Sequence, residues 1–576
     1  MNMAHFHIKK KKGRPYLYVR EIARVAGKPR VVSQTYIGSP QKVAALAGGP
    51  WQEISRLKVE EFGALWLAHQ LDTDMDIAKI VDSVIRRGER ESGPSVGEYF
   101  LYCIFNRLVE AVSKNSLRRW YQHTAIQQIR PVNLQELSSQ RYWEKWHHID
   151  EGTLHRCSTL FFARLWEIAP PPADCLLFDT TNYYTFMASH TPSQLARRGK
   201  NKAGRHSLRQ VGLGLLVARG SRLPLYYSVY PGNLHDSTHF ASVMEEMFGI
   251  VRRFHSTTPS LTVVLDKGMN ASENFAFLDA HPHLHFVTTY SPSFAPRLTA
   301  LPLSRFAVVK TRKNQRLLAE GKAAECLLAY RTQGEYWGKE RAVVVTYNPA
   351  TARKQAITFQ KKLLTLRREL WAMRRKVAQG APHWRDPLAI QARYRRLCQK
   401  LHLPSRLFTL TISSGKSTLT MRYRKNSSHL RRRESLFGKH IIITDQKDWS
   451  TIEVVEASLD RWQVENRFRL SNDRDLVGVQ PVRHWTDNMI RCHLFTCVVA
   501  LTYLRRIELV LAAQGIERSA EEVMEDMRHL HSVLTLQKNA RKPLRRLETP
   551  SKSQEEILRV FKHRVDESGV LQPIVD

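Results

Sequence analysis

The stretch "LTVVLDKG" (residues 261–268) is a short, β-branched apolar run that ends in a single aspartate, Asp266. A second run of the same kind, "CLLFDTT" (175–181), places Asp179 in the same position. β-branched and aromatic residues favour strands, and a strand buried on both faces reads as a continuous apolar run. Side chains at the carboxyl ends of strands line the ligand crevice of an α/β sheet. The two aspartates are therefore predicted to lie at one edge of one sheet.

Further segments around these two runs predict the rest of the sheet. Strand-like runs lie at 210–218, 224–232 and 285–291, and helical patterns lie at 236–254 and 270–281. Three strands, a helix, and then strand, helix and strand are typical of a mixed α/β sheet with helical crossovers. The pattern resumes at "KHIIITD" (439–445), which the helix that holds Glu465 follows. Trp462 with Leu459 and Val455, and Phe468 with Val464, give that helix apolar residues with which to pack against the sheet.

A chain of 576 residues is too long for one hydrophobic core, so we expect several domains. Strand-like pieces and a long basic helix at 352–380 interrupt the α/β pattern, and the residues beyond 545 are polar and expected to be loose. The expected parts are a basic N-terminal β region that binds DNA (1–60), a helical domain (61–172), the first part of the α/β core (173–300), an insertion (301–436), the second part of the core (437–515) and a polar C-terminal tail (516–576).

The charge of the chain indicates a polyanionic partner. There are 89 Lys and Arg residues against 53 Asp and Glu, a formal charge of +36. A field of that sign attracts polyanions, of which nucleic acid is the commonest in a cell, although ribosomal, membrane-surface and heparin-binding proteins share the signal. The seven cysteines form no CxxC pair, and the N-terminus has no apolar signal region. We expect a cytoplasmic protein with no membrane segment.

Glu465, in "ASLDRWQVENRFRLSNDRD" (457–475), is a candidate third carboxylate. Arg461 and Arg469 lie one helical turn before and after it, so an exposed ion pair also accounts for it. For Asp179 and Asp266, the alternative is that each starts a turn or caps a helix. Three carboxylates that meet would suit Mg²⁺, which takes oxygen ligands, and a two-metal site needs one carboxylate that bridges both ions.

Other polar residues allow a structural interpretation beside a functional one. Asp236 is better placed as a helix N-cap than as a ligand. Cys492, His493 and Cys497 lie in an apolar helix at 485–512, where buried small residues are commoner than a metal site. Lys9, Lys10, Lys11 and Lys12 form either a solvated arm or a segment that follows DNA phosphates.

Four ordered blocks resemble the DDE transposases of bacterial insertion sequences, most closely the insertion-sequence-four group and its relatives. "FDTTNYYTF" (178–186) is similar to the first-Asp motif, and "RQVGLGLLVARGSRLPLYYSVYPGNLHD" (209–236) to the two strands after it. "VVLDKGMNASENFAFL" (263–278) is similar to the second-Asp motif, and "RWQVENRFR" (461–469) to the catalytic-Glu helix. The resemblance covers roughly residues 100–510 with gaps.

The resemblance implies an RNase H-like α/β fold: a mixed sheet flanked by helices, with a β-rich and helical insertion before the catalytic Glu. It makes Asp179, Asp266 and Glu465 the catalytic, metal-binding triad for two Mg²⁺ ions, with Mn²⁺ as an alternative. It also implies a bacterial transposase with endonuclease activity, which nicks its terminal inverted repeats and joins the freed 3′-OH to target DNA. The expected partners are double-stranded DNA and a second copy in a synaptic complex, and the expected location is the nucleoid.

The expected DNA contacts are basic or polar side chains near the triad and in the N-terminal arm. They are Arg461, Arg469, Arg474, Lys9, Lys10, Lys11, Lys12, Thr181 and Asn233.

Two positions depart from the family pattern on the Glu helix. The family places a Tyr and a Lys where this chain has Ser458 and Asn472, and those residues are thought to touch DNA phosphates. Arg469 or Arg474 would then supply the missing contact. The alternatives are a domesticated, catalytically weakened DNA-binding protein and another RNase H-like nuclease such as a resolvase.

Overall fold

The computed structural model describes most of the chain, with gaps in the N-terminal arm and in several loops. The described residues are 3–11, 14–25, 28–39, 54–88, 91–170, 175–188, 190–199, 204, 207–234, 240–241, 243–247, 249, 260–414, 419–473, 475–537 and 543–574.

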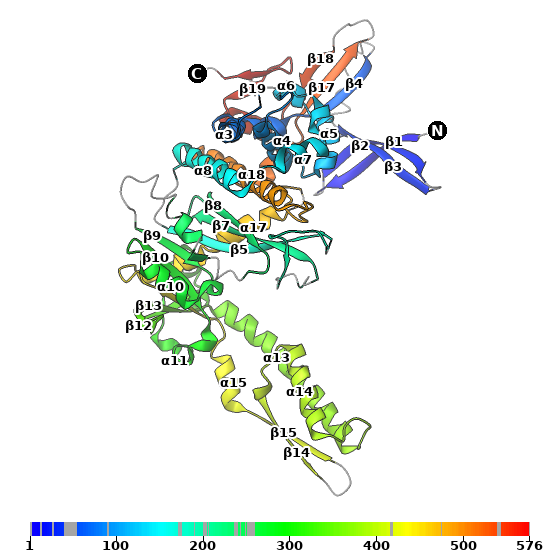
Figure 1. Cartoon of the computed structure of the whole chain (residues 1–576). Helices are drawn as coiled ribbons and strands as arrows, with labels where there is room; N and C mark the ends of the chain where they lie inside the picture. Colours follow the sequence, from blue (N-terminus) through cyan, green and yellow to red (C-terminus); the bar gives the residue numbers. More distant parts are fainter. Residues whose placement is uncertain are drawn as a thin grey trace.

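A ten-stranded mixed sheet forms the centre of the molecule (Figure 1). Its strands are β5 (Cys175–Thr185), β6 (Arg197–Arg198), β7 (Arg209–Ala218), β8 (Pro224–Pro231), β9 (Leu261–Leu265), β10 (Leu284–Tyr290), β11 (Ala307–Val308), β12 (Leu328–Tyr336), β13 (Lys339–Tyr347) and β16 (Lys439–Thr444). The order β8-β7-β5-β9-β10 has β5, β9 and β10 parallel and β7 antiparallel to both neighbours. This is the RNase H-like mixed sheet expected from the sequence, and all five predicted strands are confirmed.

The register of β5 and β9 brings the two aspartates together. The parallel pair aligns Cys175 with Thr262 and Leu177 with Val264, an offset of 87 residues. Asp179 and Asp266 are also 87 residues apart, so continuing this register by two residues places them side by side. Neighbouring strands are about 4.8 Å apart. The two carboxylates therefore lie side by side on adjacent central strands, at the level where β9 ends.

The segment between β10 and β16 has two structurally different parts. β11, β12 and β13 extend the central sheet, because β13 pairs antiparallel with β16, which also pairs with β10. The remainder forms a projecting body with its own hydrophobic core (Figure 1). Its elements are α13 (Pro349–Ala378), α14 (Pro387–Leu401), η6 (Ser405–Leu407), β14 (Phe408–Ser414), β15 (Leu419–Lys425) and α15 (Ser427–Glu434).

Two helices that follow β16 in the sequence pack on the sheet. α18 (Asp487–Ala513) packs on β8, and α16 (Thr451–Leu459) packs on β10, β13 and β16. The shorter helical elements of this part are η2 (Lys267–Met269), α10 (Ser272–Asp279), η3 (Pro292–Phe294), α11 (Pro296–Thr299), η4 (Leu303–Arg305), α12 (Arg312–Ala319) and η5 (Ala323–Glu325). The expected helix at 236–254 lies largely outside the described residues, but its described apolar residues, spaced as on one helix face, are buried: Phe240, Val243, Met244 and Met247.

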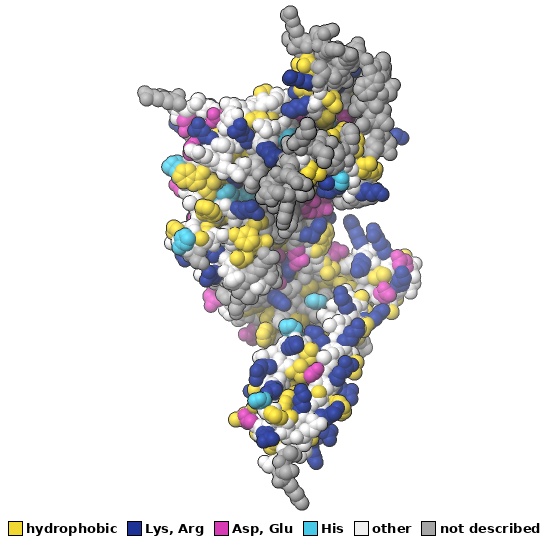
Figure 2. Space-filling view, turned by 90° about the vertical axis from the view of Figure 1, so that its right-hand side faces the viewer, with side chains coloured by type: hydrophobic (Ala, Val, Ile, Leu, Met, Phe, Trp, Pro, Cys, Tyr) yellow, Lys and Arg dark blue, Asp and Glu magenta, His cyan; other side chains and the backbone are white. Residues whose placement is uncertain are grey.

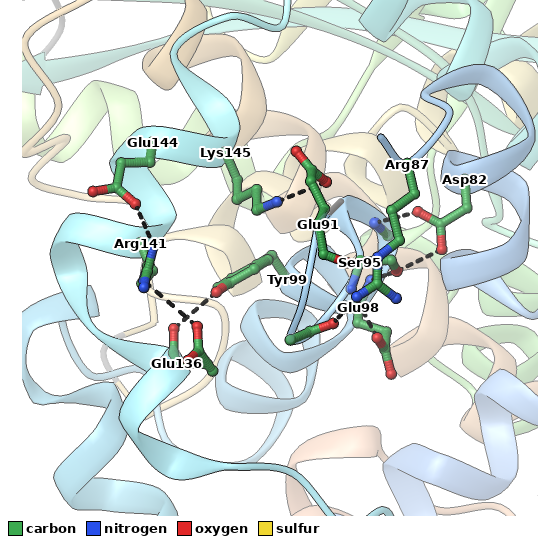
Figure 3. A network of polar contacts seen from close by, with 12 residues as sticks. Asp82, Arg87, Glu91, Ser95, Glu98, Tyr99, Glu136, Arg141, Glu144 and Lys145 are labelled. Atoms are coloured by element: carbon green, nitrogen blue, oxygen red, sulfur yellow. Dashed lines mark hydrogen bonds and ion pairs between the residues drawn. The ribbon is translucent and has the colours of Figure 1, made fainter. Parts of the chain in front are cut away.

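The N-terminal helical region packs against α18. Its elements are α2 (Gly63–Thr73), α3 (Ile77–Val84), α4 (Val96–Val109), α5 (Lys114–Tyr121), α6 (Ile126–Ile129), η1 (Leu134–Leu137), α7 (Ser139–Trp146) and α8 (Glu151–Ile168). A polar network fixes the start of α4 (Figure 3). Ser95 and Glu98 form a capping box, and the Ser95 hydroxyl and the Gly97 amide both donate to the Asp82 carboxylate of α3. The orphan donors of the helix terminus are thereby satisfied.

Residues 516–576, expected as a polar tail, are instead mostly folded. The elements are α19 (Ala520–Met527), β17 (His531–Gln537), β18 (Leu544–Leu547), α20 (Lys552–Val560), β19 (His563–Val565) and β20 (Leu571–Pro573). β17 pairs with β4 (Ile54–Glu61) from the other end of the chain, and α20 buries Ile557 and Leu558. α19 buries Ala520, Val523, Met524 and Met527, and these apolar residues lie among charged ones that dominate the sequence of the segment.

The N-terminal region is a three-stranded antiparallel sheet, in keeping with the basic β region expected there. Its strands are β1 (Met3–Lys11), β2 (Arg14–Val25) and β3 (Lys28–Gly38). Tyr16 stacks on His529 with ring centroids 4.8 Å apart, so the sheet contacts the C-terminal segment. None of the helices in the described part of the chain is both long and apolar enough to cross a bilayer.

Candidate active site

The three predicted carboxylates occupy different environments around one position. Asp179 lies within β5 and is 6% exposed, and its Oδ1 accepts a hydrogen bond from the Thr180 amide at 2.9 Å. Asp266 follows β9, and its Oδ1 accepts from the Lys267 amide at 2.8 Å. Glu465 lies in the first turn of α17 (Trp462–Ser471), and its side chain is 55% exposed. The site thus contains a buried carboxylate, a partly exposed one and an exposed one.

Arg461 joins these carboxylates. It donates from Nη1 to Asp266 Oδ1 at 2.6 Å and from Nη2 to Glu465 Oε1 at 2.8 Å. Burial alone would lower the pKa of Arg461, but the charges of Asp266 and then Asp179, with the hydrogen bonds, raise that pKa above its ordinary value. The guanidinium is therefore a permanent cation among three carboxylates. The ion pair that the sequence allowed for Glu465 exists, and it is shared with Asp266.

Two helices, α16 and α17, meet at Asp460 and Arg461. The sequence predicts one helix with Leu459 and Trp462 on its packed face, but α16 ends at Leu459, α17 begins at Trp462, and these two side chains are 52% and 44% exposed. The Asp460 carboxylate accepts from Arg219 Nε at 2.8 Å. Gln463 Oε1 accepts from the Gly220 amide at 3.1 Å. Both contacts hold the break against the loop between β7 and β8.

The other end of α17 is fixed to the strand that carries Asp179. The Tyr183 hydroxyl of β5 and the Ser471 hydroxyl of α17 form a buried hydrogen bond of 2.6 Å. Side chains alternate along a strand, so Asp179 and Thr181 lie on the same face of β5 as Tyr183 and look toward α17. The helix is held at both ends, and this fixes Glu465 near the two aspartates.

The donor chemistry of the site fits a hard divalent cation, although the side chains are not arranged as a metal site. Nowhere among the described residues do three His, Cys, Asp or Glu side chains gather closely enough to hold a metal ion. Here, Arg461 is the cation between the carboxylates. Carboxylate oxygens are the ligands that Mg²⁺ takes in proteins, so Asp179, Asp266 and Glu465 are suitable once the guanidinium moves aside.

The other predicted DNA contacts are dispersed over the fold, and of these Thr181 lies next to the triad, on the same strand and face as Asp179. Arg469 is 65% exposed and pairs with Glu521 at 3.5 Å. Thr181 is half-buried on β5, and Asn233 is exposed after β8. Lys9 and Lys10 are exposed on β1, and Lys11 is in the same strand, next to the helical region and not next to β5 (Figure 1). Lys12, Arg474 and the N-cap candidate Asp236 lie outside the described residues.

The two positions that depart from the family pattern differ in environment. Asn472 follows α17, donates from Nδ2 to the Phe468 carbonyl at 3.0 Å and accepts from Gln480 Nε2. Its amide therefore closes the end of the helix. Ser458 is half-buried in the last turn of α16. Cys492, His493 and Cys497 are buried in α18, as the structural interpretation requires.

One charged cluster near the site was not predicted. Arg467 of α17 is almost fully buried, and its Nη2 lies 3.6 Å from Glu508 Oε2 of α18. Burial lowers the pKa of Arg467 to about 10. The only signal in the sequence was an arginine between the apolar residues Val464 and Phe468, and its acidic partner is 41 residues away.

The chain has distant structural similarity to a known protein and no detected relative in sequence. No family model matches the chain, and no curated protein matches its sequence. One similar solved structure is a piggyBac transposase in a synaptic complex with hairpin DNA, 8% identical, with 82% of each chain covered and a TM-score of 0.36. A likeness at that score is no evidence for a shared activity or ligand.

Proposed function

We propose that this protein is a DDE transposase that cleaves and joins DNA through Asp179, Asp266 and Glu465. The observation that carries the proposal is the shared 87-residue offset, which brings Asp179 of β5 beside Asp266 at the carboxyl end of the adjacent parallel strand β9, near a glutamate on a fixed helix. The charge of +36 supports DNA as the substrate. The motif resemblance adds terminal inverted repeats as the cleaved sequence, a second copy in the synaptic complex, and a bacterial, nucleoid-associated setting.

The three carboxylates would hold two Mg²⁺ ions, which make a water or 3′-OH nucleophilic and stabilise the leaving oxygen. Asp179 is buried and accepts a backbone hydrogen bond, so it would be the least mobile of the three ligands. Glu465 is exposed on the side from which DNA would approach. Arg461 would exchange its carboxylate partners for a DNA phosphate, which guanidinium groups bind well.

The test of the proposal is a nicking assay with the full-length protein. The substrate is a supercoiled plasmid that carries the DNA flanking the coding region, incubated with and without millimolar Mg²⁺. We expect Mg²⁺-dependent nicks at the element ends, which EDTA removes and added Mg²⁺ restores. Tight DNA binding with no nicking in Mg²⁺ or Mn²⁺ would instead favour a catalytically weakened DNA-binding protein. Ser458 and Asn472, which depart from the family pattern, suggest this alternative.

Replacing Arg461 with glutamine is expected to increase Mn²⁺ affinity in the absence of DNA by about tenfold or more. The reason is electrostatic, because the substitution removes a cation that lies within hydrogen-bond distance of two ligands. Mn²⁺ binding would be measured by electron paramagnetic resonance of the free ion. The same variant is expected to nick DNA more slowly, since its phosphate contact is lost.

Arg469→Gln is the matched control for this substitution. It removes the same charge eight residues further along the chain, where Arg469 pairs with Glu521. Its Mn²⁺ affinity should stay within about twofold of the wild type, because an exposed charge contributes little. Equal Mn²⁺ affinity in Arg461→Gln and the wild type would show that Arg461 does not compete with the metal.

A further inference from the structure

The projecting body carries an unusual share of the protein's positive charge. Residues 349–434 contain 22 Lys and Arg against three Asp and Glu, a net charge of +19 out of +36 for the whole chain. Figure 2 shows Lys and Arg side chains over much of this body. Its separate core includes Leu363, Leu366 and Leu370 of α13, so one face of α13 is committed to internal packing.

The opposite face of α13 carries a row of exposed apolar side chains. Ile357, Leu364 and Trp371 are 53%, 60% and 54% exposed, and each is seven residues from the next. Residues seven apart lie almost above one another on a helix, so the three form a single line about 21 Å long. We call this line the α13 ridge.

Basic side chains border the α13 ridge on both sides. The neighbours of a helical residue on the surface are three and four positions away. Of the eight such positions along the ridge, seven are exposed Lys or Arg and the eighth is Gln360: the seven are Arg353, Lys354, Lys361, Arg367, Arg368, Arg374 and Arg375. The Arg375 guanidinium also lies 4.9 Å over the Trp371 ring.

This pattern does not suit a partner helix. A coiled-coil seam needs apolar residues at both a and d positions. The positions that would complete the seam here are Gln360, Arg367 and Arg374 on one side of the ridge, or Lys361, Arg368 and Arg375 on the other. In a pair of α13 helices from two copies of the chain, the Lys and Arg side chains beside one ridge would lie against the Lys and Arg side chains beside the other. The ridge is therefore one residue wide, apolar in the middle and cationic on both sides.

The DNA major groove has the complementary arrangement. It is about 12 Å wide, admits an α-helix, has phosphates along both walls and exposes the thymine C5-methyl group on its floor. A ridge of about 21 Å spans roughly six base pairs at 3.4 Å each. We propose that α13 lies in the major groove with its basic borders on the two phosphate walls and its ridge against thymine methyl groups. This inference relies on the proposed function only in taking DNA as the partner.

The test compares two duplexes that differ only in thymine methyl groups. The probes are a 24-bp duplex of alternating A·T pairs and the same duplex with uracil in place of thymine, each titrated with the full-length protein. We expect the wild type to bind the thymine duplex about fivefold more tightly. Leu364→Gln should reduce that ratio to about one without changing the salt dependence, because it removes an apolar contact and no charge.

Leu388→Gln is the matched control, since Leu388 is 75% exposed on α14 of the same body. It should keep the wild-type preference for thymine. Equal binding of both duplexes by the wild type would overturn the proposal, as would a Leu364→Gln variant that keeps the preference or that changes only the oligomeric state. The assay needs no catalysis, so a protein that prefers thymine but never nicks DNA would contradict the proposed function and leave this inference standing.

Discussion

Asp179→Ala is expected to lower the rate of Mg²⁺-dependent nicking by at least about a thousandfold. Asp179 is buried beside Asp266 in the register of β5 and β9, so no water or neighbouring carboxylate can readily take its place as a ligand. Loss of a metal ligand removes several kcal/mol of transition-state stabilisation, and each 1.4 kcal/mol is a factor of ten. The rate would be measured on the plasmid substrate under single-turnover conditions.

Two further variants make the result interpretable. Asp179→Asn keeps the shape of the side chain and should be as inactive as the alanine variant, with DNA affinity within about twofold of the wild type, because phosphate contacts dominate that affinity. Asp448→Ala removes an exposed aspartate from the segment between β16 and α16 and should nick at the normal rate. Normal nicking by Asp179→Asn would remove Asp179 from the proposed triad.

Much of the central sheet could be predicted because its signals are local. β5, β7 and β9 each contain a short apolar run, and burial on both faces makes such runs easy to recognise. The 87-residue spacing between Asp179 and Asp266 is visible in the sequence. The spacing alone does not show that the two aspartates are neighbours, because the same spacing in another register of β5 and β9 would separate them.

The features that were not predicted depend on contacts between distant segments. The break at Asp460 depends on Arg219, which is 241 residues away. The pairing of β4 with β17 joins the two ends of the chain, and nothing in either strand alone specifies its partner. A continuous helix from Val455 to Phe468 was therefore the natural expectation from apolar spacing, and tertiary contacts overrode it.

Arg461 bridges two carboxylates because α17 packs against β5. Its own backbone is helical, and it lies one turn before Glu465, as in an ordinary surface pair. The packing of α17 on the sheet brings Asp266 within reach of the same guanidinium. The local signal correctly identified the pair, but only the fold brings the second carboxylate to it.

Glu508→Ala is expected to lower the free energy of unfolding by about 3–5 kcal/mol. Arg467 is held in the interface between α17 and α18 with a side chain only 2% exposed, and Glu508 is its counter-charge. Removing one member of a buried ion pair leaves an uncompensated charge, which is the costly case. Glu508 also accepts from Arg505 and from the Ala520 amide, so those donors would lose a partner too.

Chemical denaturation at pH 7, followed by intrinsic tryptophan fluorescence, would measure this loss. Glu517→Ala is the control, because Glu517 is exposed shortly after α18 and should change stability by no more than about 0.5 kcal/mol. Adding Arg467→Met to Glu508→Ala should recover a large part of the loss, since an apolar side chain of similar length needs no counter-charge. A double variant no more stable than Glu508→Ala would show that the cost arises from the other Glu508 contacts. Because α17 carries Glu465, the single variant should also nick DNA more slowly at temperatures where it is still folded.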